Sequence, residues 1–282
     1  KHTLLENLLF HPRLGVLINL TSDLGWRASL STGFRAPQVF DEDLHITQVG
    51  GQGVIIRNSD KLKEESSLSL SSGLDYGHRW GAGLLRGSVE FFHTKLVDTF
   101  VLNQRERDTL SNALIFERVN GGESQVSGAS WEGSYRLDGK GEISFGITLQ
   151  RSRLKEPEPD FGTRRFFRSP NLYGFASLTA ELGAIGEAEL SLDLTGPMKV
   201  PHYRGWIEED RLENSPWFYD LSLRYRREVS LGGGRSLKVT LSCFNLLDSR
   251  QKDLDRGALR DSGYVYGPAR PRTFSLAGEF NF

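Results

Sequence analysis

Apolar and polar residues alternate along most of this chain, and that period of two restricts its fold more than any other feature of the sequence. The alternation is clearest at 142–150, 187–194, 237–242 and 273–282. Successive side chains of a β-strand point to opposite faces of a sheet, so each segment is expected to have one apolar and one polar face. We count about twelve such segments and none with the helical period, and therefore predict an all-β protein.

The predicted strands are roughly 9 to 15 residues long, which suits tilted membrane-crossing strands better than the shorter strands of soluble sheets. Short links alternate with long ones along the chain. The short links lie at 21–23, 138–141 and 232–234, and the long ones at 35–62, 153–166, 201–215 and 248–263. Short turns at one rim and long loops at the other are typical of an outer-membrane β-barrel.

A soluble β-sandwich alternates in the same way and is the alternative interpretation. Aromatic residues near the ends of the predicted strands favour the membrane barrel, because Trp and Tyr gather at membrane–water interfaces. These residues are Trp26, Phe34, Tyr76, Trp80, Trp131, Trp217 and Tyr219. In a barrel, one face of each strand meets lipid and the other lines a wet lumen. For the last strand we predict that Phe274, Leu276, Phe280 and Phe282 face lipid and that Ser275, Glu279 and Asn281 face the lumen.

Composition excludes several other classes of protein. A formal net charge of -1 over 282 residues is unlike a basic nucleic-acid-binding module. The chain has no apolar run of about 18 residues, so no transmembrane helix is predicted, whereas barrel strands average out as polar. A single cysteine, Cys243, excludes an internal disulfide and a cysteine metal cluster. The chain opens at Lys1 with neither an initiator Met nor a signal peptide, and we interpret it as a fragment of a longer protein.

Four short motifs and the last residue make the barrel interpretation more specific. Residues 33–37 read Gly-Phe-Arg-Ala-Pro, 62–66 read Leu-Lys-Glu-Glu-Ser, 245–248 read Asn-Leu-Leu-Asp, and 267–272 read Gly-Pro-Ala-Arg-Pro-Arg. In this order, and followed by a terminal Phe282, they resemble the strand-and-loop motifs of TonB-dependent outer-membrane receptors. The resemblance spans 25–282, nearly all of the chain.

The resemblance implies that 1–282 is a partial barrel domain of an antiparallel transmembrane β-barrel, with about 12 C-terminal strands of a barrel of about 22. The plug domain and the N-terminal strands would lie outside this chain. The implied location is the outer membrane of a Gram-negative bacterium. The implied partners are the remaining plug and barrel segments, the TonB energy-coupling protein acting through the plug, outer-membrane lipid and lipopolysaccharide, a small chelate ligand and, as a further candidate, a surface lipoprotein. No cofactor, protein-bound metal ion or nucleic-acid partner is expected.

The function implied by the resemblance is energy-coupled uptake of a scarce metal-containing nutrient, without enzymatic activity. A ferric siderophore is the first candidate, cobalamin the second and heme the third. An outer-membrane lipase or protease is an alternative, but it would need a Ser and a His in hydrogen-bond reach, and the sequence shows no such pairing at a strand end. A passive porin is the other alternative, and its gene would encode no plug upstream of Lys1.

The first candidate ligand contact is an acidic stretch with an imidazole in the long link after residue 37. It comprises Asp41, Glu42, Asp43 and His45, whose oxygen and nitrogen atoms could coordinate a cation or meet a polar ligand. A solvated loop edge is the alternative interpretation. His45 lies in the interval where heme receptors of the family often carry a histidine, but 58–60 lacks the Asn-Pro that follows it there.

The second candidate set combines rings and a cation. It comprises Tyr203, Arg204 and Trp206 in one long link and Tyr264 and Tyr266 near the last loop. Such side chains suit the grip of a small flat or hydrophilic ligand at a barrel mouth. The alternative for the residues at 203 and 206 is the interfacial aromatic belt. The arginines at 164–168 are interpreted as contacts with lipopolysaccharide phosphates outside the barrel, with an anionic ligand as the alternative.

Overall fold

The computed structural model describes residues 10–37, 54–107, 114–261 and 263–282, and these form the predicted all-β fold. The strands are β1 (Arg13–Asn19), β2 (Leu24–Arg35), β3 (Val54–Asn58), β4 (Glu65–Trp80), β5 (Gly83–Arg107), β6 (Leu114–Leu137), β7 (Gly141–Leu154), β8 (Leu172–Glu181), β9 (Glu187–Thr195), β10 (Lys199–His202), β11 (Arg211–Asn214), β12 (Phe218–Gly232), β13 (Arg235–Phe244) and β14 (Thr273–Asn281). One turn of 3₁₀-helix, η2 (Gly183–Ile185), precedes β9. No helix within the described ranges has the length and apolar character needed to cross a membrane.

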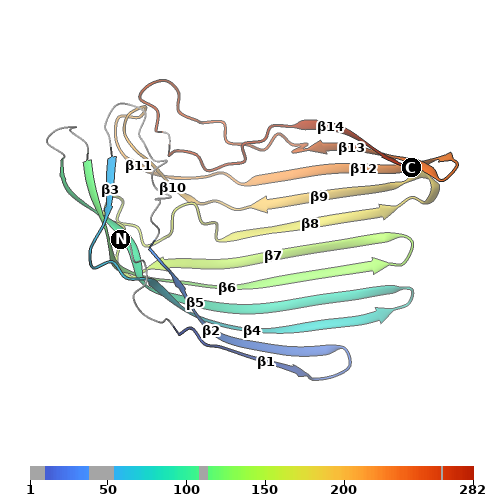
Figure 1. Ribbon diagram of the computed structural model, residues 1–282, viewed down its shortest axis with the longest axis horizontal. Helices are drawn as coiled ribbons and strands as arrows, with labels where there is room; N and C mark the ends of the chain where they lie inside the picture. Colours follow the sequence, from blue (N-terminus) through green and yellow to red (C-terminus); the bar gives the residue numbers. More distant parts are fainter. Residues whose placement is uncertain (1–9, 38–53, 108–113, 262) are drawn as a thin grey trace.

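Twelve of the strands form one curved sheet (Figure 1). Its order is β1-β2-β4-β5-β6-β7-β8-β9-β12-β13-β14, and every pair along this path is antiparallel. The remaining member, β3, pairs in parallel with the first residues of β6. The antiparallel wall of about twelve strands confirms the predicted fold class, and the parallel pair is a local departure from it.

The departure has a physical cause in the lengths of β5 and β6. These strands have 25 and 24 residues, longer than predicted, and β7 pairs with β6 only from Ser124 onward. The first residues of β6 therefore keep one edge of backbone N–H and C=O groups that β7 does not cover, and β3 pairs with five of them. Unpaired strand edges are costly, so a short added strand stabilises the extended hairpin.

The strand register sorts side chains onto two faces. One face carries a row of serines from five neighbouring strands: Ser134, Ser144, Ser177, Ser191 and Ser222. The opposite face carries apolar rows such as Leu178, Leu190 and Leu223, which are 48%, 39% and 44% exposed. An apolar face that extends over the whole sheet suits contact with lipid rather than water.

The last strand, β14, follows the predicted alternation. Phe274, Leu276 and Phe280 lie opposite Cys243, Leu241 and Leu237 of β13, whereas Ser275, Glu279 and Asn281 lie opposite Ser242, Lys238 and Ser236. The predicted division into two faces is therefore confirmed for this strand. Contact of its apolar face with lipid stays a prediction.

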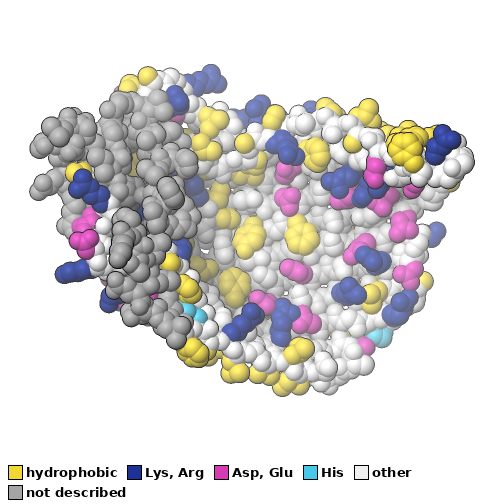
Figure 2. Space-filling view, viewed as in Figure 1, with side chains coloured by type: hydrophobic (Ala, Val, Ile, Leu, Met, Phe, Trp, Pro, Cys, Tyr) yellow, Lys and Arg dark blue, Asp and Glu magenta, His cyan; other side chains and the backbone are white. Residues whose placement is uncertain are grey.

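The polar face is crossed by ion pairs. Arg27 contacts Asp75 and, at 2.8 Å, Glu90, while further along the sheet Arg226 lies 2.7 Å from Glu187. Figure 2 shows charges of both signs gathered over the part of the sheet nearer the short hairpins. Opposite charges on neighbouring strands offset one another, so this part of the wall is polar without a large excess of either sign.

The predicted short and long links lie at opposite ends of the sheet, but the link between β5 and β6, at the end of the long links, spans only 108–113. Tight hairpins join β1 to β2, β4 to β5, β6 to β7, β8 to β9 and β12 to β13 at one end of the sheet, and the long links lie at the other end (Figure 1). In the β12–β13 turn, Gly232, Gly233 and Gly234 all have positive φ angles of 61–80°, a conformation that costs glycine little. We call the two ends of the sheet the short-hairpin end and the long-loop end.

The sheet is open among the described residues. β1 pairs only with β2, and β14 only with β13. Both outer strands therefore present backbone groups with no strand beside them, as expected for a piece of a larger barrel wall.

Candidate ligand-binding site

Two long links at the long-loop end pack against each other. The first joins β9 to β12 and contains the hairpin of β10 and β11, and the second joins β13 to β14 over 245–272. We call them the hairpin loop and the 245–272 loop. They supply the hydrophobic cluster of the described residues, formed by Met198, Val200 and Tyr264 with Tyr266 packed against it. Because the wall is a single sheet whose apolar face has large exposed side chains, the hydrophobic cluster lies in these loops.

Asn245 fixes the start of the 245–272 loop. This residue is fully buried (0% exposed), and its φ of 49° is a left-handed conformation that asparagine tolerates better than most residues. Its amide nitrogen donates to the Arg270 carbonyl at 2.8 Å, and its amide oxygen accepts the Ser249 backbone N–H at 2.8 Å. Arg272 Nε also donates to the Leu246 carbonyl at 2.8 Å. The motifs at 245–248 and 267–272 are thus joined at the base of the loop.

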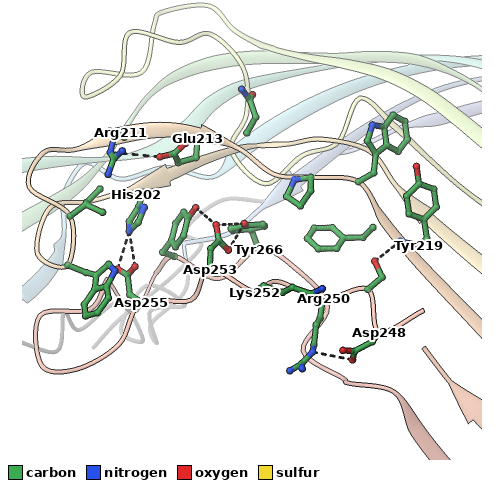
Figure 3. A pocket seen from close by; sticks show the side chains of 18 of the residues that line it. His202, Arg211, Glu213, Tyr219, Asp248, Arg250, Lys252, Asp253, Asp255 and Tyr266 are labelled. Carbon is green, nitrogen blue, oxygen red and sulfur yellow. Dashed lines mark hydrogen bonds and ion pairs between the residues drawn. The ribbon is translucent and has the colours of Figure 1, made fainter. Parts of the chain in front are cut away.

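His202 connects the hairpin loop to the 245–272 loop. Its Nε2 lies 3.1 Å from both carboxylate oxygens of Asp255, and the two side chains are only 7% and 1% exposed (Figure 3). The imidazole stacks on the Tyr264 ring with centroids 3.6 Å apart and planes at 10°. Asp255 also accepts the Asp261 backbone N–H at 2.9 Å. These contacts hold the two loops together as one unit.

Two tyrosine hydroxyls converge on one carboxylate behind this contact. Tyr264 donates to Asp253 at 2.9 Å and Tyr266 donates to it at 2.7 Å (Figure 3). Burial acts to raise the pKa of Asp253, but the hydrogen bonds to its carboxylate, chiefly those from Tyr266 and Tyr264, together lower that pKa. Burial, together with the hydrogen bond to Asp253, raises the pKa of Tyr264 to about 12 and raises that of Tyr266 further. Both phenols therefore stay protonated at neutral pH and are used as hydrogen-bond donors within the protein.

An open cavity of about 760 Å³ lies between the two loops (Figure 3). Its exposed aromatic side chains are Trp206, Trp217 and Tyr219, and its basic side chains are Arg211, Arg250 and Lys252. Two of these cations already have acidic neighbours, with Arg211 3.9 Å from Glu213 and Arg250 3.2 Å from Asp248. Rings with charges of both signs suit a small ligand that offers a flat apolar surface and mixed polar groups.

The cavity includes three of the nine predicted ligand residues: Trp206, Tyr264 and Tyr266 line it. The four residues of the acidic stretch, Asp41, Glu42, Asp43 and His45, lie outside the described residues. Their roles stay predictions.

Tyr203 and Arg204 are close to this unit but do not line its cavity. The Tyr203 backbone N–H donates to the Asp261 carboxylate at 2.9 Å, and its ring lies 5.6 Å from that of Phe161. Burial raises the Tyr203 pKa to about 12, assisted by nearby carboxylates. The Arg204 backbone N–H donates to Asp210 at 2.6 Å. In the structure both residues contribute contacts within the loops.

The sequence interpretation missed His202, Asp253 and Asp255 as parts of the site. His202 follows Pro201 in no metal-binding spacing, and Asp253 and Asp255 lie in an ordinary charged stretch. His202 and Asp255 meet across 53 positions, and Asp253 meets Tyr264 and Tyr266 within one loop, at 11 and 13 positions, so no local spacing reveals these contacts. Within the described residues, no group of three or more His, Cys, Asp or Glu side chains is placed to hold a metal ion.

The chain belongs to a known family. Residues 7–246 match the model of the TonB dependent receptor-like β-barrel family, which confirms the resemblance drawn from the motifs. This is a family of receptors and not of enzymes. No curated protein matches the chain.

Solved structures with a similar fold are receptors and transporters. A mutant of the ferric enterobactin receptor PfeA from Pseudomonas aeruginosa, in complex with enterobactin, has a TM-score of 0.67 at 16% identity over 95% of this chain and 40% of its own. The iron transporter FrpB from Neisseria meningitidis has a TM-score of 0.63 at 19% identity over 95% and 38%. The copper transporter OprC has a TM-score of 0.66 at 16% identity over 96% and 39%. The chain thus spans about 40% of the length of these proteins, and the likeness is one of fold.

Proposed function

We propose that this chain forms part of the wall and the outer loops of a receptor that takes up a metal chelate across the outer membrane of a Gram-negative bacterium. Family membership over residues 7–246 is the observation that carries the proposal. The proposed source of energy is TonB, acting through a plug domain that would lie outside this chain. Outer-membrane lipid, lipopolysaccharide and a surface lipoprotein are further proposed partners.

A ferric siderophore is the first proposed cargo, with cobalamin second and heme third. Similar folds occur in proteins named for ferric enterobactin, iron and copper, which favours a metal-containing cargo. The chemistry of the cavity supports capture of an intact chelate. Because the phenols of Tyr264 and Tyr266 are protonated and donate to Asp253, they are poor ligands for a bare metal ion. The exposed rings and the charges of both signs would instead contact the organic shell of the chelate.

The two alternatives differ in their support. The family match is to receptors, so it gives no support to an outer-membrane lipase or protease. A passive porin would conduct without a plug and without tight binding. Tight and saturable binding of one chelate would therefore separate the proposed receptor from a porin.

The test is direct binding to the full-length receptor. Ferric siderophores, cyanocobalamin and hemin are titrated in parallel by calorimetry, and we expect tight binding of one of them. Trp206→Ala should weaken that binding about tenfold, as is common for an aromatic anchor that a ligand covers. Trp80→Ala is the matched control, because Trp80 is also highly exposed (71%) but lies at the short-hairpin end. Tight binding of an oligosaccharide or a peptide, with none of the three chelates bound, would overturn the proposal.

A further inference from the structure

Three links of the long-loop end meet at Arg168. This residue lies in the link between β7 and β8, over 155–171, which we call the 155–171 loop. Its guanidinium donates to the Gly263 carbonyl and, through Nε at 3.2 Å, to the Val265 carbonyl, both in the 245–272 loop. Its backbone N–H donates to the Lys199 carbonyl of the hairpin loop at 2.8 Å. One residue thus ties the 155–171 loop to both of the loops that form the cavity.

The backbone of Arg168 is held in a conformation that is unfavourable for it. Its φ of 53° lies in the left-handed region, which is costly for a residue with a Cβ atom. Such a conformation persists only where the surroundings hold it, and it is concentrated at sites that clamp a ligand. Phe167 supports it from the preceding position, because it forms a parallel bridge with Lys199 and its ring meets that of Phe161 edge-on at 5.9 Å. The packing therefore fixes the backbone from which the Arg168 side chain extends.

The two carbonyls that accept from Arg168 flank Tyr264, whose ring lines the cavity. The side chain of Gln251, a residue only 6% exposed, holds the same segment: its amide nitrogen donates to the Tyr264 carbonyl at 3.0 Å, and its amide oxygen accepts the Tyr266 N–H at 2.9 Å. The C=O and N–H of a trans peptide point in opposite directions. Arg168 and Gln251 therefore hold the peptide group between Val265 and Tyr266 from opposite sides.

We propose that Arg168 is a positioning residue of the ligand site, which sets the fit of the cavity to a chelate from outside the cavity. The cavity lining does not include Arg168, so it acts through Tyr264 and Tyr266, which do line it. Tyr264 also stacks on His202 at 3.6 Å, so a displaced Tyr264 would change the contact between the hairpin loop and the 245–272 loop as well. The inference rests on the proposed function, because it takes this cavity as the place where the chelate binds.

The neighbouring arginines offer an internal comparison. Arg164 and Arg165 are exposed, and their side chains make no hydrogen bond or ion pair with the described residues. Arg168 is also exposed, but its guanidinium directs separate N–H groups at two carbonyls. An ammonium group is a single point donor and cannot reproduce that fork. Lysine would therefore replace Arg168 if only its charge mattered, and would fail to replace it if the residue positions the tyrosines.

The experiment compares the full-length receptor with its Arg168→Gln and Arg168→Lys variants. Association and dissociation rates are measured by surface plasmon resonance for ferric enterobactin, cyanocobalamin and hemin, and amide hydrogen exchange is measured on the same samples. We expect both variants to release the bound chelate about tenfold faster at an unchanged association rate, the equivalent of one lost hydrogen bond. Exchange at 263–266 should rise in both variants, whereas β12 and β13 should stay protected.

Arg165→Gln is the matched control, because it makes the same change of charge in the same stretch and should change neither the rates nor the exchange. Wild-type release in Arg168→Lys would overturn the proposal, since a positive charge alone would then suffice. Equally slowed association in Arg168→Gln and Arg165→Gln would overturn it too, because the stretch would then act as a surface charge. Faster exchange without faster release would mark a structural contact only and overturn the positioning role. If Arg168→Gln does not fold, Arg168→Lys carries the test.

The failure of this inference and of the proposed function can be told apart. A wild-type receptor that binds one of the three chelates, with the same rates in Arg168→Gln, overturns the positioning role alone. A wild-type receptor that binds none of them overturns the proposed function and the positioning role with it.

Discussion

Replacing Asn245 by alanine should open the 245–272 loop while leaving the barrel wall intact. The wall is joined by strand pairing that does not involve this side chain, whereas the base of the loop depends on it. The variant removes the donor to the Arg270 carbonyl and the acceptor for the Ser249 N–H. It also places alanine in a left-handed conformation, with φ near 49°.

The magnitude follows from these contacts. Two buried hydrogen bonds contribute about 1 kcal/mol each, and the left-handed conformation costs alanine about 1 kcal/mol. The free energy of opening the loop should therefore fall by about 3 kcal/mol, roughly a 150-fold rise in the population of the open loop. Asn245→Gly loses the same bonds but adopts the left-handed conformation without strain. It should lower the free energy of opening by about 2 kcal/mol.

Amide hydrogen exchange of the full-length receptor measures this free energy for each segment. We expect faster exchange in 245–272 for both variants, with the alanine variant the faster, and unchanged exchange in β6 and β7. Asn171→Ala is the matched control, because Asn171 is exposed and its side chain makes no hydrogen bond with the described residues. Wild-type protection of the loop in Asn245→Ala would refute the reasoning. Equal exchange in the alanine and glycine variants would refute the contribution of the left-handed conformation.

Three further outcomes are expected. His202→Ala should loosen the hairpin loop and weaken chelate binding in calorimetry, because it leaves the Asp255 carboxylate, which is 1% exposed, without its imidazole partner. His78→Ala breaks an exposed pair and should change neither loop mobility nor chelate binding. Leu178→Lys on the apolar face should destabilise the folded receptor by about 2–4 kcal/mol in denaturant unfolding, whereas Ser177→Lys on the polar face should cost much less, and equal effects would contradict the assignment of faces. Removal of Phe282, which is 98% exposed beyond β14, should lower the amount of assembled receptor in outer-membrane fractions, and unchanged assembly would argue against its role as a recognition signal.

The wall could be predicted from sequence because its rule is local. A side chain in a one-layer sheet faces one of two environments, so polarity at every second residue, as at 142–150, determines both strand and face. Alternation of polarity does not predict how far a hairpin extends beyond the part of the sheet that has an apolar face. The lengths of β5 and β6, and the parallel pairing of β3, were missed for that reason.

The loop unit was predicted only in part, because its contacts join distant positions. Exposed aromatic residues such as Trp206 are recognisable as candidate contacts from their type alone. The pairing of His202 with Asp255 depends on how two loops fold over each other, and neither residue stands out in the sequence. Asn245 was found only through the motif that contains it. Its buried amide donates a hydrogen bond to the Arg270 carbonyl and so joins that motif to the one at 267–272.

The open edges of the sheet connect the fold to the proposed function. On each of β1 and β14, about half of the backbone N–H and C=O groups point away from the paired neighbour, and in lipid each unpaired group costs several kcal/mol. No loop contact among the described residues could offset such a cost, so we expect further strands to close the wall. The loops that join those strands, and a plug, would then add further side chains at the barrel mouth. Ligand selectivity should therefore depend on residues of the complete receptor together with the loop unit described here.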